Sequence, residues 1–138
     1  MTYSLRVSNG DLVLQGNQLD IVSGMDKLSQ DMQLWVAERY GIDRFHPAMG
    51  SLLQNFIGSA ITAGTQVGVQ QEVLRVLDNY AKVQLKAFKE NPQNFSYSEL
   101  LISVDAVNVS ISYDTVGVSV QITNGTQTST SVAVTAST

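Results

Sequence analysis

The sequence predicts an α+β fold with a small N-terminal hairpin, a helical core of two main helices, and a C-terminal antiparallel β-ribbon available for strand addition. Two stretches between residues 23 and 90 carry apolar residues at the helical period, whereas the chain beyond residue 98 alternates apolar and small polar residues. The length of 138 residues fits one domain, 1–138, divided into N-terminal strands (1–22), helical core (23–90) and β-ribbon (98–138).

The N-terminal region predicts short strands. Alternating runs at Tyr3 to Val7 and Asp11 to Gln15 flank an Asn-Gly pair at 9–10, which supplies the positive φ angles of a tight hairpin turn. A similar run from Leu19 to Val22 predicts a third strand. We find no internal repeat in the sequence.

The first main helix is expected to begin at Ser23, which offers an N-cap, with Asp26 in the first turn. Gly41 is placed to end it. Its apolar positions are spaced three, four and seven residues apart, so that they form one face that belongs to the core. They are Met25, Leu28, Met32, Trp35, Val36 and Tyr40.

The second main helix is expected to end near Glu90, because Asn91 and Pro92 follow it. Its apolar stripe consists of Val69, Val73, Val76, Leu77, Tyr80 and Val83. Before it, residues 41–51 contain two glycines and a proline and predict an ordered turn-rich segment, followed by a short helix at Leu52 to Phe56. After it, residues 91–98 predict a polar loop.

The C-terminal strands change phase near Ala106. Apolar residues occupy even positions from Leu100 to Val104 and odd positions from Val107, which predicts a bulge or break between them. A two-residue turn at 124–125 would leave Val132 and Val134 on the wrong side of a hairpin, and a three-residue loop would restore their pairing. Either the hairpin is internal and bulged, or the last strand pairs better with another molecule.

The charge distribution suggests that the C-terminal region assembles with another chain. All eight Lys and Arg residues precede position 90, so no lysine protects the outer strand of the predicted ribbon. Natural sheets usually block an exposed edge with charge, proline or a bulge. An uncharged edge strand therefore favours strand addition, in which a partner strand extends the sheet.

Composition makes several function classes improbable. The chain has no cysteine, which removes thiol chemistry and cysteine-ligated metals, and its net charge of −4 disfavours nucleic acid as a partner. We see no signal peptide and no apolar run long enough to cross a membrane. We expect no cofactor and no metal.

The catalytic candidates have simpler interpretations. His46 lacks a second histidine or acid at metal-ligand spacing. Glu38 and Asp43 could form a carboxylate pair of the kind used in glycoside hydrolysis, but we interpret them as surface acids or partners of Arg39 and Arg44. Small residues from Gly58 to Gly68 include three glycines without the Lys-Ser/Thr of a phosphate loop, and helix packing explains them better. We expect no catalytic residue and no enzyme activity.

One group of residues resembles a known family. Gln30, Asp31, Gly41, Arg44, Pro47 and Gly50 lie between a long helix and a short one. This arrangement resembles the helix-turn core of the baseplate wedge proteins of contractile phage tails, also known as sheath initiators and historically labelled lysozyme-like. The order of elements along the whole chain is similar to that family. Two departures stand out: one residue is inserted before Arg44, and the family's Glu-Pro-Arg motif has no counterpart in residues 88–98.

The resemblance implies a structural protein of the virion, made in the host cytoplasm and located in the tail baseplate. Its expected partners are the tail sheath protein and other wedge proteins, with tube or hub proteins possible, in six copies per particle. The strands expected to join the sheath are represented by Val116, Val118, Val120, Ile122, Val132 and Val134. A peptidoglycan hydrolase of the baseplate and a generic tail adaptor remain the alternatives.

Overall fold

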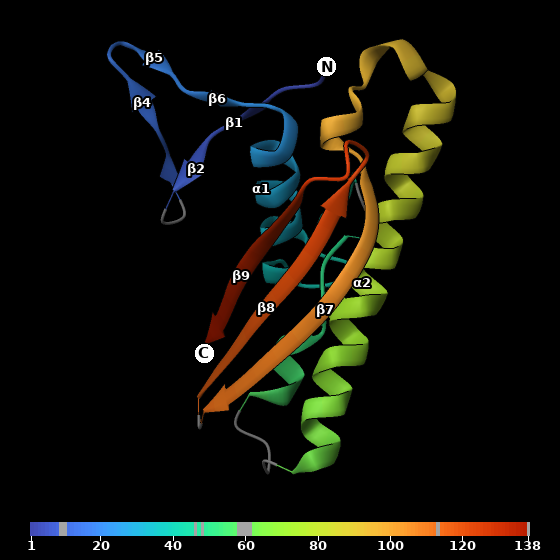
Figure 1. Cartoon of the computed structure of the whole chain (residues 1–138). Helices are drawn as coiled ribbons and strands as arrows, with labels where there is room; N and C mark the ends of the chain where they lie inside the picture. Colours follow the sequence, from blue (N-terminus) through green and yellow to red (C-terminus); the bar gives the residue numbers. More distant parts are fainter. Residues whose placement is uncertain (9–10, 46, 48, 58–61, 113, 138) are drawn as a thin grey trace.

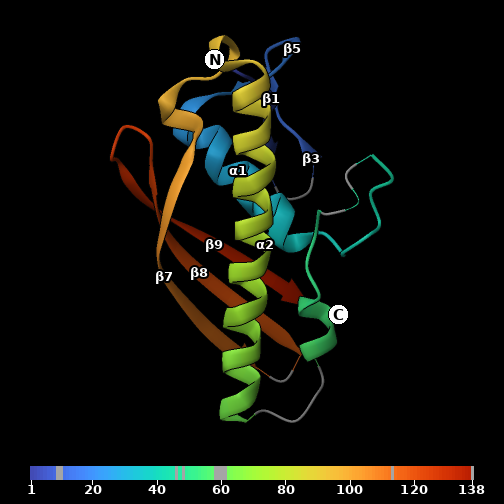
Figure 2. The same cartoon turned by 90° about the vertical axis from the view of Figure 1, so that its right-hand side faces the viewer.

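The computed structural model describes residues 1–8, 11–45, 47, 49–57, 62–112 and 114–137, and it confirms the α+β class. Helices α1 (Gly24–Ala37) and α2 (Ala63–Glu90) pack on one face of a three-stranded antiparallel sheet. The N-terminal strands form a separate projection beside the first turns of α1 (Figure 1). Figure 2 shows α2 in front of the sheet, with α1 passing behind it.

The N-terminal projection consists of six two-residue strands that pair in three antiparallel ladders. They are β1 (Ser4–Leu5) with β6 (Ile21–Val22), β2 (Val7–Ser8) with β3 (Asp11–Leu12), and β4 (Leu14–Gln15) with β5 (Gln18–Leu19). The β2–β3 ladder confirms the predicted hairpin, although its Asn9-Gly10 turn lies outside the described residues. The predicted strand at 19–22 is divided between β5 and β6.

The three ladders meet at a ring of backbone hydrogen bonds. The N–H of Arg6 donates to the carbonyl of Asp20, that of Val13 to Arg6, and that of Asp20 to Val13, over 2.9, 3.0 and 2.9 Å. These three residues are seven apart in sequence, and each lies between two apolar neighbours. The sequence analysis missed this seven-residue repetition, because its period is far shorter than the roughly 20 to 50 residues of familiar repeat architectures.

The buried face of α1 agrees with the prediction, but the helix ends earlier. Leu28, Met32, Trp35 and Val36 are buried, whereas Tyr40 is 49% exposed and lies beyond the helix. The chain leaves the helix at Glu38 because its backbone pairs instead with Ser51, whose N–H donates to the Glu38 carbonyl over 2.8 Å. Ser23 occupies the N-cap position without making a side-chain capping bond.

Helix α2 begins at a mutual cap between Thr62 and Thr65 and ends before Asn91, as predicted. Its stripe is buried from Val69 to Tyr80, but Val83 is 44% exposed and was assigned to the core wrongly. The next position, Gln84, takes its place and is only 9% exposed. Its amide donates to the Glu99 carbonyl and accepts from the Leu101 N–H, so that it pairs the backbone where the sheet begins.

Three 3-10 turns connect the main elements: η1 (Leu53–Phe56), η2 (Pro92–Asn94) and η3 (Tyr97–Glu99). The polar loop expected at 91–98 is therefore partly ordered as helical turns. Glu99 is 1% exposed, and its carboxylate accepts hydrogen bonds from the backbone N–H groups of Thr2 and Ser96. This buried acid ties the start of the chain to the connection that leads into the sheet.

The sheet consists of β7 (Leu101–Ser112), β8 (Thr115–Asn124) and β9 (Ser129–Ser137), in the order β7-β8-β9. A register shift between Val104 and Ala106 confirms the predicted bulge. A second shift between Leu101 and Ser103 was not predicted, and because of it Leu101 is buried while Ile102 is 64% exposed.

The β8–β9 hairpin brings the valines together within the chain. Val118 lies opposite Val134 and Val120 opposite Val132, a register that is closed by the bond from the Asn124 N–H to the Thr128 carbonyl over 3.0 Å. The loop therefore comprises three residues, 125–127, and it is organised by the buried side chain of Asn124. Its carbonyl oxygen accepts from the N–H groups of Thr126 and Thr128, and its amide donates to the Ser98 carbonyl. The hairpin is thus internal, but β9 pairs with β8 without the bulge that this alternative expected.

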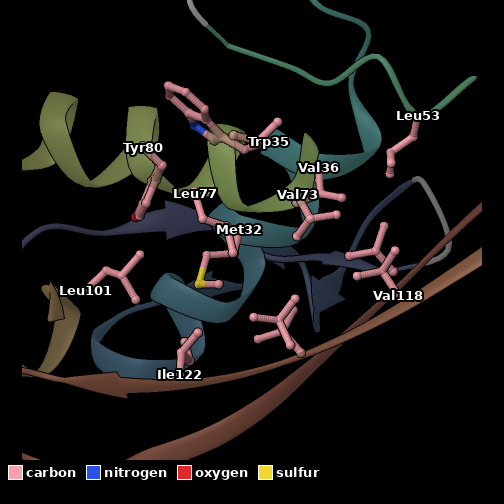
Figure 3. Packing of buried hydrophobic residues seen from close by; sticks show 14 of the residues in the cluster. Met32, Trp35, Val36, Leu53, Val73, Leu77, Tyr80, Leu101, Val118 and Ile122 are labelled. Atoms are coloured by element: carbon pink, nitrogen blue, oxygen red, sulfur yellow. The ribbon is translucent and has the colours of Figure 1, made fainter. Parts of the chain in front are cut away.

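The core lies between the two helices and the sheet (Figure 3). Met32 and Trp35 from α1, Leu77 and Tyr80 from α2, and Ile122 from β8 contribute to one cluster. The Trp35 and Tyr80 rings contact edge to face, with centroids 5.4 Å apart. Within the described part of the chain, no helix is long and apolar enough to cross a membrane.

Replacing Gln84 with leucine should destabilise the fold by about 2–4 kcal/mol, because two buried backbone groups at Glu99 and Leu101 would lose their partners. Val83→Ala, at the exposed neighbouring position, should change stability by less than about 0.5 kcal/mol. Urea denaturation followed by circular dichroism measures both. Equal midpoints for the two variants would contradict this role of Gln84.

Candidate functional site

Gln30, the first residue of the wedge-like motif, holds the N-terminal projection against α1. Its side-chain oxygen accepts from the Val7 N–H over 2.9 Å, and its amide donates to the Leu5 carbonyl over 2.8 Å. A glutamine side chain has one acceptor and two donors, so it can pair with a strand as a neighbouring backbone would. Gln30 therefore has a positioning role within the chain.

Asp31 connects the two helices. Its carboxylate pairs with Lys27 over 2.6 Å and accepts a hydrogen bond from the Tyr80 hydroxyl over 3.2 Å. Burial raises the pKa of the Tyr80 phenol well above its ordinary value, and the charge and hydrogen bond of Asp31 raise it further. The phenol stays protonated at neutral pH and acts as a hydrogen-bond donor between α2 and α1.

The other four motif residues belong to the loop that follows α1, residues 39–50. Arg39 and Ser51 form a parallel bridge at its base, and the Ser51 hydroxyl donates to the Val36 carbonyl over 2.6 Å. Gly41 and Gly50 have φ angles of 80° and 105°, which only glycine adopts freely. The loop projects from the body (Figure 2), and Arg44 and Pro47 are exposed on it. The motif residues on α1 therefore make contacts within the chain, whereas Arg44 and Pro47 on the loop are exposed.

Contacts with α2 hold the base of this loop. The Arg75 guanidinium lies 5.0 Å from the centre of the Tyr40 ring, and the Glu72 carboxylate accepts from the Leu52 N–H over 2.7 Å. Burial would raise the pKa of Glu72, but the hydrogen bonds from Arg75 and Leu52 and the charge of Arg75 together hold it below its ordinary value. Farther out, the side chains of Ile42 and Phe45 are 58% and 90% exposed. The loop is therefore anchored at its base and exposes two large apolar side chains.

Of the two acids considered for catalysis, Asp43 has a local role. Its carboxylate accepts a hydrogen bond from the Phe45 N–H over 2.8 Å, whereas Glu38 contributes its backbone carbonyl to the base of the loop. A surface hollow of about 200 Å³ next to the loop is lined by Arg39, Tyr40, Ser51, Leu52 and Asn55, and neither carboxylate lines it.

The other candidates are only partly placed. His46 and Gly58 lie outside the described residues. Gly64 and Gly68 lie in α2, and a Cβ at Gly68 would approach the Phe56 ring to 2.9 Å, as expected for a glycine that allows close helix packing.

The six strand residues expected at the sheath contact have their side chains in the core of the chain. Val116, Val118, Val120, Ile122, Val132 and Val134 are all less than 9% exposed. β8 is the central strand, so its backbone is paired on both sides. A partner strand can reach only the backbone of an outer strand, β7 or β9. The expected sheath contact would therefore involve main-chain groups at an edge of the sheet.

The edge of β9 turns backbone groups outward at alternate residues. Antiparallel pairs alternate between hydrogen-bonded and non-hydrogen-bonded, and the bond from the Asn124 N–H to the Thr128 carbonyl fixes which pairs are which. In this register the N–H and C=O groups of Ser131, Ala133 and Thr135 point away from β8. The Gln33 amide donates to the Ala133 carbonyl over 3.3 Å, which agrees with that direction.

The edge of β7 is less accessible. α2 runs beside β7 (Figures 1 and 2), and the Gln70 amide donates to the Val107 carbonyl over 3.3 Å. The two register shifts also interrupt the regular spacing of this strand at its beginning. Bulges of this kind hinder the addition of a further strand, whereas β9 pairs without a shift over its whole length.

Sequence reasoning missed the polar side chains that fix this geometry. Gln33 and Gln70 each donate to one backbone carbonyl at a sheet edge. The sequence indicates these contacts only weakly, because a glutamine on a helix is common. Gln84 leaves a stronger trace, because it lies four residues after Tyr80 and seven after Leu77, on the buried stripe. A polar residue on such a stripe predicts a buried backbone partner.

The fold is similar to that of a protein of known structure. Superposition on the crystal structure of a Geobacter sulfurreducens protein, provisionally named a tail lysozyme, gives a TM-score of 0.54 at 13% sequence identity. The match covers 91% of this chain and 94% of that chain. No family model and no curated protein matches the sequence. At this identity the similarity establishes a shared fold.

Gly50→Ala should destabilise the protein by about 2–4 kcal/mol, because the φ angle of 105° is unfavourable for alanine and a Cβ would lie 2.5 Å from the Arg39 carbonyl carbon and oxygen. Gly41→Ala is the matched control, since its φ is also positive but a Cβ would meet nothing within 4 Å. It should cost about 1 kcal/mol. Chemical denaturation distinguishes the two, and equal losses would contradict the close approach at Gly50.

Proposed function

We propose that this chain is a structural component of a contractile tail baseplate, which links the wedge to the first ring of sheath and nucleates sheath assembly by β-strand addition. The fold that it shares with a protein named for a tail supports a tail-associated role. The observation that carries the finer proposal is the β9 edge, where Ser131, Ala133 and Thr135 turn their backbone groups away from β8 on an uncharged strand, with the Ala133 carbonyl bonded to the Gln33 amide.

The strand that binds this edge would be a β-strand of the sheath protein, and the mode of binding explains the composition of β9. Strand addition uses main-chain hydrogen bonds, so the edge residues can be small and polar as long as their backbone is reachable. The side chains at 131, 133 and 135 are exposed, and Val132 and Val134 between them anchor β9 to the core. The incoming strand would displace the Gln33 amide from the Ala133 carbonyl.

A single added strand binds weakly, since each hydrogen bond contributes only about 1 kcal/mol net. Several copies arranged in a ring by the baseplate would raise the effective concentration and thus the overall affinity. We therefore propose multiple copies per particle, six by the symmetry of the resembled family, each placed by wedge proteins. The exposed loop with Arg44, Pro47 and Phe45 is the candidate wedge contact.

A peptidoglycan hydrolase is the second candidate, favoured by the provisional name of the similar protein. It would need Glu38 or Asp43 as an acid or base, and Asp43 already accepts a local backbone bond. Purified protein assayed on cell-wall peptidoglycan decides this question. Lytic activity that disappears in the Glu38→Gln/Asp43→Asn double variant would establish the enzyme instead of the structural role.

Ala133→Pro tests strand addition at one edge. Proline removes the outward N–H of residue 133 without touching the bonds to β8, so the isolated protein should stay folded while sheath nucleation falls at least tenfold. Particles should then carry bare tubes, counted by electron microscopy. Ala133→Thr keeps the N–H group and should assemble normally.

The outcome that contradicts this proposal is equally visible. Fully sheathed tails with Ala133→Pro, in particles that contain the variant, would show that β9 receives no sheath strand. Circular dichroism of the purified variant checks that any loss of sheath does not come from unfolding.

A further inference from the structure

The N-terminal projection has an apolar side that its own chain does not cover. Directly paired residues of an antiparallel ladder share one face, and the three ladders pair Leu5 with Ile21, Val7 with Leu12, and Leu14 with Leu19. Leu5 and Val7 are two residues apart in an extended chain, as are Leu12 and Leu14, and Leu19 and Ile21, so all six side chains lie on the same side. We call these six residues the N-terminal apolar face.

This face is unusually exposed for aliphatic residues. The exposed fractions are Leu5 43%, Leu12 47%, Leu14 67%, Leu19 45% and Ile21 54%. Their combined surface is on the order of 500 Å², comparable to the largest apolar patches of monomeric proteins, which commonly mark a functional contact. The side chains of Arg6 and Asp20, which form an ion pair, alternate with these residues and point to the other side.

The face is also rigidly held before any partner binds. The ring of backbone hydrogen bonds at Arg6, Val13 and Asp20 fixes the three ladders relative to one another, and Gln30 ties the ring to α1. The buried Val22 and the bonds from Thr2 to Glu99 anchor the projection at its two ends. A surface of fixed shape binds without the cost of ordering flexible segments.

We propose that the N-terminal apolar face docks on an uncharged aliphatic surface of a different protein in the same particle, which rests on the tail-associated role proposed above. Charge favours such a partner, because no charged side chain belongs to the face and Arg6 is neutralised by Asp20. This contact is separate from the sheath contact, since it uses side chains of residues 5–21 and not the backbone of β9.

Area disfavours a second copy of this chain as the occupant. A stable interface takes roughly 800 Å² from each partner, more than this face offers, so a symmetric pair would be held by too little surface. A different protein of the same particle is held by its other contacts in the assembly as well, so this face need not supply a complete interface by itself. A membrane is disfavoured because peripheral binding usually needs basic residues at the rim, and no lysine precedes Lys27.

The proposal is tested by site-specific photo-crosslinking in cells that express the full chain with the complete set of tail genes. A benzophenone amino acid at position 14 should give an adduct with one defined second protein, with the crosslinked peptide rich in uncharged aliphatic residues. The same probe at Gln15, in the same strand but on the opposite side, should give at least tenfold less of that adduct. Placed at Ala133, it should report the sheath strand independently.

The Leu14→Gln/Leu19→Gln variant provides the functional arm. Both side chains are exposed, so the purified variant should keep the thermal midpoint of the unmodified chain, while its incorporation into particles, measured by quantitative mass spectrometry, should fall at least tenfold. Gln15→Ala/Gln18→Ala, on the opposite side of the same hairpin, should incorporate normally.

Failure of this proposal is distinguishable from failure of the sheath contact. If the probe at position 14 gives no adduct while the probe at position 133 captures the sheath protein, the docking proposal alone is overturned. If position 14 gives its adduct and position 133 does not capture the sheath protein, strand addition alone is overturned. If the probe at position 14 captured a defined protein from a complex other than a tail, the result would support docking by this face and contradict the tail-associated role. Two further results would overturn the choice of partner. One is a dimer in analytical sedimentation, and the other is cosedimentation with phosphatidylcholine–phosphatidylglycerol vesicles, if the Leu14→Gln/Leu19→Gln variant abolishes either of them.

Discussion

The central strand β8 is the constraint on which the rest of the structure depends. Its backbone is hydrogen-bonded on both sides, and Val116, Val118, Val120 and Ile122 point from it into the layer between the sheet and the two helices. Burying side chains of this kind stabilises a fold by about 1.5–3 kcal/mol each relative to exposure. Because the inward side chains of the strands are buried in the core, other molecules can reach only the edges and the outer face of the sheet.

Amide and carboxylate side chains fix how the remaining elements join this core. Gln84 and Glu99 set the position where β7 begins, Asn124 organises the hairpin loop, and Gln30 attaches the N-terminal projection. In each case the side chain pairs with backbone groups that no strand or helix could satisfy. Such pairing makes a joint specific, since a shift by one residue would leave buried polar groups without partners.

The proposed activities use different parts of the same molecule. The β9 edge contributes main-chain groups and suits a strand, whereas the N-terminal apolar face contributes rigid side chains and suits a packed surface. The loop after α1 contributes a third, more local protrusion, on which Phe45 is exposed. A small body with several separate contact surfaces is consistent with a linking role, in which assembly depends on neighbours more than on self-association.

The sequence by itself determined the order and type of the elements, because apolar periodicity reports directly which side of a helix or strand is buried. The bulge at Ala106, the end of α2 before Asn91 and most of the stripes on both helices could be predicted in this way. The exposure of Tyr40 and Val83 could not be predicted. Tyr40 continues the apolar period of α1 after the helix has ended, and at the end of the α2 stripe the polar residue Gln84 is buried in place of Val83.

Only the tertiary structure decided which strands remain open. The register of β8 and β9 depends on the Asn124 loop, the openness of each edge depends on where α2 and Gln33 lie, and the apolar face of residues 5–21 exists only because three ladders close into a ring. These are contacts between residues distant in sequence. No local pattern encodes them, because each depends on the position of a partner that the rest of the fold supplies.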